Sequence, residues 1–247
     1  MKKILAFSLA MATSVVVNAE VLYTFDFSSN GRLTNNTSWR AYSGADGSIT
    51  NDGSQAWIGA GAEDVGATNV YAAQSGLVYL GLDVRVNSRG SGGQEYTVGF
   101  LSGANTMAGR VFMSITNAGG GSLAAGLFRL GLGGDGTAAT LATDVLSLGT
   151  TYRVVVGYNN ATDTHSLWIN PTGLDELTPT LTITEAVTAN PNGFFIRQAN
   201  TWGSGGTSWN ADNLVVATDF ASVVPEPSTL AMFSLAAAAL LRYRRRK

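Results

Sequence analysis

The amino-acid sequence predicts an all-β fold for residues 20–223, an antiparallel sandwich of two sheets. Apolar residues recur at every second position in short runs, which is the pattern of strands with one buried face. Turn signals such as Asp52-Gly53 and Asn192-Gly193 separate the runs. No window longer than about ten residues in this part repeats with the helical period of 3.6. A parallel β-helix is the alternative, but no repeat of fixed period supports it.

The expected strands follow from this alternation. The first, at residues 21–27, places Tyr23, Phe25 and Phe27 on one face. In the second, at residues 77–86, Leu82 and Val84 face one side of the sheet, whereas Asp83 and Arg85 face the other. The later strands are expected at residues 77–86, 95–101, 111–116, 123–132, 152–158, 165–170, 181–184, 193–198 and 213–218. Many short strands in about 200 residues are typical of a sandwich or jelly roll.

The composition of residues 20–223 excludes some partners. This part contains 8 arginines, no lysine and 16 acidic residues, so that its formal charge is −8. A domain that binds nucleic acid needs clustered Lys and Arg, and no such cluster occurs here. The chain has no cysteine, which excludes disulfides and thiolate metal sites.

The first 19 residues have the features of a secretory signal peptide. Met1-Lys2-Lys3 forms a basic start, residues 4–17 are largely apolar, and Val17-Asn18-Ala19 places small residues where a signal peptidase reads. Cleavage after Ala19 would make Glu20 the first residue of the exported protein. An uncleaved N-terminal anchor is the alternative.

A second sorting signal is expected at residues 224–247. Val224-Pro225-Glu226-Pro227-Ser228 precedes an apolar segment at 229–241 and a basic end at 242–247. This arrangement resembles the PEP-CTERM sorting tails of Gram-negative bacteria. The resemblance implies an exported protein that is tethered to the inner membrane and processed by an exosortase at Pro225, Glu226 and Pro227. The cell surface or the extracellular space would be its destination.

The physical properties of this tail agree with a short transmembrane helix. As a helix, residues 230–241 would be about 18 Å long, against a bilayer core of about 30 Å. The flanking cations can reach the interface and stay on the cytoplasmic side. They are Arg242, Arg244, Arg245, Arg246 and Lys247. The alternative is an ordinary C-terminal anchor that is not processed.

Two motifs in the β domain suggest a family of sandwiches. The runs Thr151-Tyr152-Arg153-Val154-Val155-Val156-Gly157-Tyr158 and Ser166-Leu167-Trp168-Ile169-Asn170 resemble the late hairpin of laminin-G-like, concanavalin A-like domains. Ala211-Asp212-Asn213-Leu214-Val215-Val216 resembles their closing strand, which lies beside the first. The resemblance implies a jelly roll, often with a concave sheet that faces carbohydrate.

No catalytic residues are expected. Sandwich glycosidases resemble one another in a Glu-x-Asp-x-x-Glu strand, which is absent here. Glu63 and Asp64 are adjacent in a glycine-rich stretch that indicates a turn. Asp83 and Glu95 could meet on one sheet face, but exposed acids on strands are usually only solvated. His165 is the only histidine, and no nucleophile elbow accompanies it. A histidine metal site would need several ligands.

Calcium is the one metal for which candidate ligands exist. Asp26, at the end of the first strand, would neighbour Asp212 and Asn213 if the first and last strands pair. Carboxylate and carbonyl oxygens are the ligands that calcium takes. The alternative is that Asp212 and Asn213 only shape a turn through hydrogen bonds to the backbone.

Four tryptophans are candidates for ligand binding: Trp39, Trp57, Trp202 and Trp209. They lie in polar, Gly/Ser/Asn-rich surroundings, where a ring can stack on the apolar face of a sugar. The alternative is that they cap the core. Trp168, inside a strand, is expected to be packed.

The sequence therefore suggests a non-enzymatic, exported surface or matrix protein, with polysaccharide as the candidate ligand. Two alternatives are a carbohydrate-active hydrolase or lyase and a purely structural or adhesive protein. The expected partners are the secretion machinery, signal peptidase and an exosortase.

Overall fold

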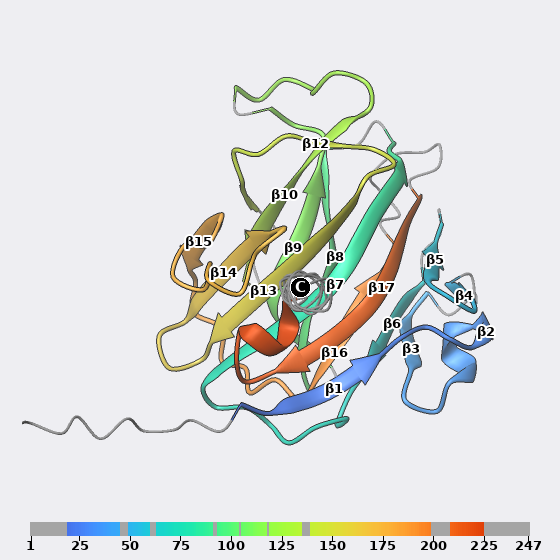
Figure 1. Ribbon diagram of the computed structural model, residues 1–247, viewed down its shortest axis with the longest axis vertical. Coiled ribbons are helices and arrows are strands. Elements are labelled where there is room, and N and C mark those ends of the chain that lie inside the picture. Colours follow the sequence, from blue (N-terminus) through green and yellow to red (C-terminus); the bar gives the residue numbers. More distant parts are fainter. Residues whose placement is uncertain are drawn as a thin grey trace, which may run out of the picture.

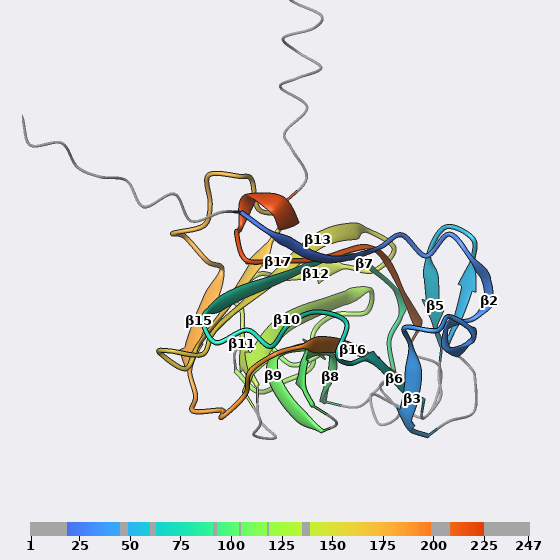
Figure 2. The same cartoon turned by 90° about the horizontal axis from the view of Figure 1, so that it is seen from below.

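The computed structural model describes residues 19–224, except 45–48, 60–62, 91–92, 104, 118, 135–138 and 199–207. The described part contains seventeen strands and two short 3-10 helices, and no α-helix. The strands form two antiparallel sheets that pack face to face, as the edge-on view shows most clearly (Figure 1, Figure 2). This confirms the predicted all-β sandwich.

Sheet A carries both the first and the last strand of the domain. Its spatial order is β15 (Leu181–Thr184), β14 (Thr164–Ile169), β13 (Thr151–Asn159), β7 (Leu77–Ser88), β17 (Ser208–Ala217), β5 (Ala56–Ile58), β4 (Thr50–Asp52) and β2 (Asn30–Arg32), with β1 (Val21–Phe25) paired to β17. The 3-10 helix η1 (Leu33–Asn35) follows β2. The predicted pairing of the first with the last strand and the predicted β13–β14 hairpin are both present.

Sheet B forms the second layer. Its spatial order is β11 (Thr140–Leu141), β10 (Leu127–Gly133), β9 (Thr106–Ser114), β8 (Gln94–Ser102), β16 (Gly193–Arg197), β6 (Asp64–Ala67) and β3 (Arg40–Ser43), with β12 (Leu146–Ser147) paired to β10. The strand expected at 123–132 begins only at Leu127, because a bridge between Thr116 and Ser122 closes a turn ahead of it.

The alternation in the sequence explains which side chains fill the space between the sheets. In β7, Leu80, Leu82 and Val84 lie in the core, whereas Arg85 is exposed on the outer face of sheet A. The same alternation in β17 places Trp209 in the core. Each half-buried strand thus contributes one row of side chains to the core and one row to an outer face.

The chain ends its described part on the outer face of sheet A. After β17 it turns into the 3-10 helix η2 (Ala221–Val223), which lies over that face (Figure 2). Its apolar contacts form a second cluster, separate from the main core, whose members are Tyr79, Val155, Trp168, Ala217, Phe220, Val223 and Val224. This cluster attaches the last described residues firmly to the sandwich.

Several sequence predictions fall outside the described residues: the signal peptide up to residue 18, Trp202, and the tail from Pro225 to Lys247 with its expected apolar helix at 229–241. Within the described ranges, no helix has the length and apolarity needed to cross a membrane. Glu20, the expected first residue of the exported protein, is hydrogen-bonded through its backbone to Thr218 at the end of β17.

Candidate functional site

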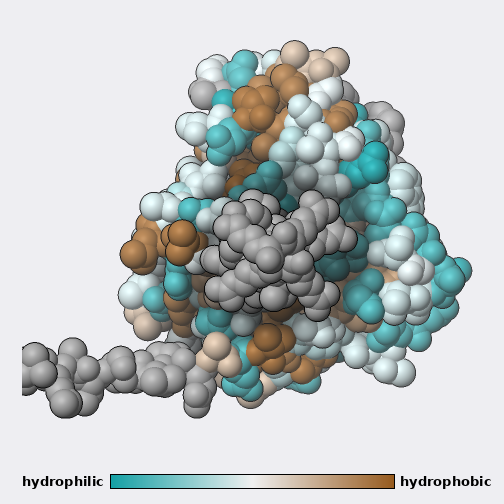
Figure 3. Space-filling model, viewed as in Figure 1, coloured by the Kyte–Doolittle hydropathy of each residue, from teal (hydrophilic) through white to brown (hydrophobic). Residues whose placement is uncertain are grey.

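A row of four side chains, three of them exposed and one, Asn210, buried, crosses the outer face of sheet A. Trp57 of β5 lies opposite Asn210 of β17, Asn210 opposite Arg85 of β7, and Arg85 opposite Thr151 of β13. Neighbouring strands are about 4.8 Å apart, so these four residues, here called the polar row, span about 14 Å. Trp57 is 43% exposed. The surface around β5, β4 and β2 is mostly hydrophilic or neutral (Figure 3).

Side-chain hydrogen bonds from Asn210 of β17 to the neighbouring strands β7 and β5 hold the centre of the polar row in place. The side chain of Asn210 accepts a hydrogen bond from Asn87 Nδ2 at 2.5 Å and donates one to the carbonyl of Ala56 at 3.2 Å. Asn210 is therefore a fixed residue between two exposed ones, Trp57 and Arg85. A small hollow of about 100 Å³ adjoins it and is lined by Gln55, Asp83, Arg85, Thr151, Asn210, Ala211 and Asp212.

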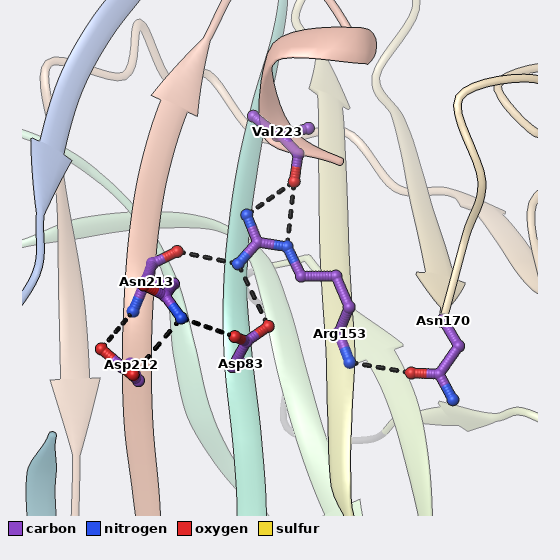
Figure 4. A network of polar contacts seen from close by, with 6 residues as sticks. All are labelled: Asp83, Arg153, Asn170, Asp212, Asn213 and Val223. Carbon is purple, nitrogen blue, oxygen red and sulfur yellow. Dashed lines mark hydrogen bonds and ion pairs between the residues drawn. The ribbon is translucent and has the colours of Figure 1, made fainter. Parts of the chain in front are cut away.

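The carboxylates of Asp83 and Asp212 lie next to the polar row, where the two residues are opposite each other on β7 and β17 (Figure 4). Asn213 sits in a β-bulge with a φ of 50°, a left-handed conformation that asparagine tolerates better than most residues. Its side-chain amide donates to Asp83 Oδ2 at 2.8 Å and to Asp212 Oδ2 at 3.3 Å. The bulge thus turns one amide nitrogen toward both carboxylates.

Arg153 of β13 joins the two carboxylates' strands to the 3-10 helix η2 (Figure 4). Its Nη1 donates to Asp83 Oδ1 at 3.3 Å and to the carbonyl of Asn213 at 2.8 Å. Its Nε and Nη2 donate to the carbonyl of Val223 at 3.0 and 2.6 Å. We call Arg153, Asp83, Asn213 and Val223 the Arg153 clamp. It fixes the backbone one residue before Val224.

Gly81 allows the clamp to form. A Cβ atom at this position of β7 would lie 2.6 Å from the carbonyl oxygen of Val223 and 2.7 Å from Nη2 of Arg153. Only glycine leaves room for the backbone of η2 to come this close to the sheet.

Burial shifts the pKa values of Asp212 and Arg153 in opposite directions. Burial raises the pKa of Asp212, and the negative charges of Asp83, Asp26 and Asp52 raise it further, although the backbone amide of Asn213 opposes them. Burial lowers the pKa of Arg153, and the charge of Asp83 opposes this effect. The arginine is thus the positive centre of an otherwise acidic patch.

The three side chains predicted as calcium ligands already have hydrogen-bond partners in the structure. The pairing of β1 with β17 does bring Asp26 and Asn213 to one hollow of about 330 Å³. However, Asp26 accepts a hydrogen bond from the amide of Ser28, and Asn213 turns its amide nitrogen toward the carboxylates of Asp83 and Asp212. Across the described part of the chain, no group of three or more acidic or histidine side chains is placed to hold a metal.

The structure separates the candidate tryptophans. Trp39 is 3% and Trp209 is 1% exposed, and both belong to the main core. A ring enclosed by the core cannot stack on a sugar, so the prediction of a binding role for these two is wrong. The alternation of Trp209 and Ala211 with Asn210 and Asp212 was the signal that would have placed Trp209 inside. Trp57 alone of the described candidates is open to a ligand.

Trp168 and His165 are both buried and hydrogen-bonded within the fold. Trp168 is packed as expected, and its Nε1 donates to the carbonyl of Asp175. His165 is completely buried in β14, where its Nδ1 accepts from the amide of Gly109 and its Nε2 contacts the carbonyl of Glu185. Burial lowers its pKa, which favours the neutral ring.

The acidic residues considered for catalysis do not come together. Asp83 lies in sheet A and Glu95 in sheet B, so they cannot share a sheet face. The expected turn at residues 63–64 is wrong for Asp64, which begins strand β6 and pairs with Arg197 at 3.1 Å. Sequence reasoning also missed Asn210, Thr151 and Arg153 as site residues, although the alternation in residues 151–159 places Thr151 and Arg153 on one face.

Comparison with known proteins identifies the tail and the fold. Residues 223–247 match the PEP-CTERM protein-sorting motif. No curated protein matches the chain in sequence. Among solved structures, a sialidase is similar with 13% identity and a TM-score of 0.54 over 79% of this chain, which spans 18% of that sialidase.

Two further solved structures are similar to this chain. The CBM2 module of an evolved Dit protein from Lactobacillus casei BL23 phage J-1 has 12% identity and a TM-score of 0.51, covering 82% of this chain and 98% of the module. An alginate lyase from Alteromonas sp. 272 has 11% identity and a TM-score of 0.48, covering 74% of this chain and 95% of the lyase. These similarities concern the fold. The chain is thus an antiparallel β-sandwich that carries, at residues 223–247, a PEP-CTERM motif of the kind that directs export sorting and recognition by an exosortase.

Proposed function

We propose that this chain is a non-enzymatic protein of the cell surface or extracellular matrix that binds polysaccharide through the polar row of sheet A. The observation that carries the proposal is the row itself. An exposed indole can stack on the apolar face of a sugar, while the exposed side chains of Arg85 and Thr151 offer donors and acceptors for its hydroxyl groups. Asn210 is buried between them and fixes the strands that carry the row. A track of about 14 Å suits an oligosaccharide better than a single sugar.

The sorting motif supports the proposed location at the cell surface or in the extracellular matrix. The Arg153 clamp holds the carbonyl of Val223, and Pro225 follows only two residues later. A processing enzyme would therefore meet the Pro-Glu-Pro segment directly beside a fixed point of the sandwich. The fold is compatible with a binding role, since a structure with the same fold is named a CBM2 module.

The intact mass of the protein tests the sorting step. In protein recovered from its host, we expect loss of residues 1–19 and truncation near Pro225–Pro227 in the material from the medium. Membranes and medium are measured separately. A chain found only in membranes and still carrying Arg242–Lys247 would contradict release and leave a tethered protein.

Replacing Trp57 with alanine tests the binding step. We expect affinity for the best polysaccharide on a glycan array to fall at least about tenfold, because stacking of the indole on the sugar is lost. The free energy of unfolding should change by no more than about 0.5 kcal/mol, since the side chain is exposed. The matched control is Leu177→Ala, which removes a 92% exposed side chain outside the polar row. Unchanged affinity in Trp57→Ala would overturn the assignment of the site.

One observation favours a second function, hydrolysis. Asp83 and Asp212 face each other, and the raised pKa of Asp212 is a property of general acids in glycosidases. Release of reducing ends from a bound polysaccharide, lost in Asp212→Asn, would replace the binding proposal with a hydrolase. Binding without release would support the binding proposal.

A further inference from the structure

The outer face of sheet B, on the far side of the sandwich from the polar row, carries three arginines. They are Arg110 of β9, Arg129 of β10 and Arg197 of β16, and each alternates with residues of the main core. All three are largely enclosed: Arg110 is 5% and Arg129 is 9% exposed, and the side chain of Arg197 is 19% exposed. Enclosed cations require partners, because burial of an uncompensated charge is costly.

Two of the three arginines have such partners. Arg197 pairs with Asp64 at 3.1 Å and with Glu95 at 2.7 Å, and its guanidinium lies 4.1 Å from the centre of the Tyr96 ring. The guanidinium of Arg110 lies 4.8 Å from the centre of the same Tyr96 ring, and its Nε donates a hydrogen bond to the carbonyl of Gly134. Both side chains are therefore part of the folded framework.

Arg129 differs from them. Its Nε is fully enclosed and has no hydrogen-bond partner, and no carboxylate or carbonyl in the described part of the chain pairs with its guanidinium. The residue opposite it is Ser114, whose hydroxyl already donates to the carbonyl of Gly93 and accepts from the amide of Thr116. Arg129 is thus nine-tenths buried, and the described residues provide no counter-charge for its guanidinium.

We propose that Arg129 is the centre of an anion-binding site on sheet B that takes the carboxylate of an acidic sugar residue. A guanidinium forms paired hydrogen bonds with a carboxylate, and these are strongest where water is excluded. One unpaired arginine fits one carboxylate. The choice of a sugar as the carrier of the carboxylate rests on the proposed function. Since this face is opposite the polar row, one molecule would contact polysaccharide from both sides.

The site makes an unusual prediction for stability. If Arg129 is kept for a ligand, it destabilises the ligand-free protein, and Arg129→Met should raise the Tm by at least about 3 °C. If Arg129 instead serves the fold, the same substitution should lower the Tm. The control is Arg32→Met, which makes the same charge change at an exposed position of β2 and should leave the Tm unchanged.

The experiment measures thermal unfolding of the full chain in detergent with sodium glucuronate, glucose and sodium sulfate as separate probes. We expect glucuronate to raise the Tm of the unmodified protein and of Arg32→Met, and to have no effect on Arg129→Met. Glucose should have no effect through this site. An equal response to sulfate would overturn the assignment to a sugar carboxylate, and a response that persists in Arg129→Met would overturn the site.

The same variants separate this inference from the proposed function. Loss of polysaccharide binding in Trp57→Ala with no glucuronate response at Arg129 would remove the second site and leave the function intact. A glucuronate response at Arg129 in a protein whose binding does not depend on Trp57 would remove the function assigned to the polar row and leave the anion site.

Discussion

Arg153→Ala is expected to lower the free energy of unfolding by about 3 kcal/mol. The substitution removes an ion pair with Asp83 and leaves the carbonyls of Asn213 and Val223 without their donors. Breaking a buried pair costs about 3–5 kcal/mol, and the lower end applies because the Asp83 side chain is 25% exposed. Urea denaturation of the full chain in detergent measures the change.

The matched control for this prediction is Arg32→Ala, which removes an exposed arginine of β2 and should cost less than about 0.5 kcal/mol. Hydrogen exchange adds a local readout, because the amide of Val223 bonds to the carbonyl of Phe220 within η2. Exchange at this amide should accelerate in Arg153→Ala beyond what global unfolding explains. If both variants cost the same, the clamp does not hold the end of the chain.

Trp39→Ala is expected to have a similarly large effect, about 3–5 kcal/mol of stability. The Trp39 ring lies 5.4 Å from Phe25 and 5.1 Å from Phe194, so its removal opens a cavity between the two sheets. The same denaturation experiment measures it. The effect distinguishes a core tryptophan from a binding one, since Trp57→Ala removes the same side chain from an exposed position.

One outcome would contradict the assignment of Trp39 to the core. If Trp39→Ala were as stable as the unmodified protein but lost polysaccharide binding, Trp39 would be a ligand platform as the sequence first suggested. Trp39→Phe helps to identify the cause, because it keeps an aromatic ring in the cluster and should recover part of the lost stability.

The clamp also connects the fold with sorting. Sheet A contributes Asp83, Arg153 and Asn213 from three neighbouring strands, β7, β13 and β17, to hold one carbonyl at the end of the domain. A polar network that spans three strands forms only when the sheet is complete. We therefore expect the backbone at Val223, two residues before Pro225, to be held in place only in a folded sandwich.

Much of the fold could be predicted from local patterns. The alternation in residues 77–86 and 152–158 identified strands β7 and β13 and their outward residues, because side chains of a strand alternate between its faces. The five short strands between residues 30 and 67 were missed. They have three or four residues each, too few for an alternating pattern, and are stabilised by neighbours far away in the sequence, as β5 is by β17.

The sequence by itself determined the sandwich class, the sorting motif at residues 223–247 and the exclusion of cysteine chemistry, since each depends on composition or on residues close together in the chain. Only the tertiary structure decided which of the described tryptophans are exposed, that Arg153 joins Asp83 to the carbonyls of Asn213 and Val223, and that Arg129 has no partner among the described residues. Burial and pairing depend on strands brought together across up to 198 residues, as the bond between Glu20 and Thr218 shows. No local pattern records such contacts.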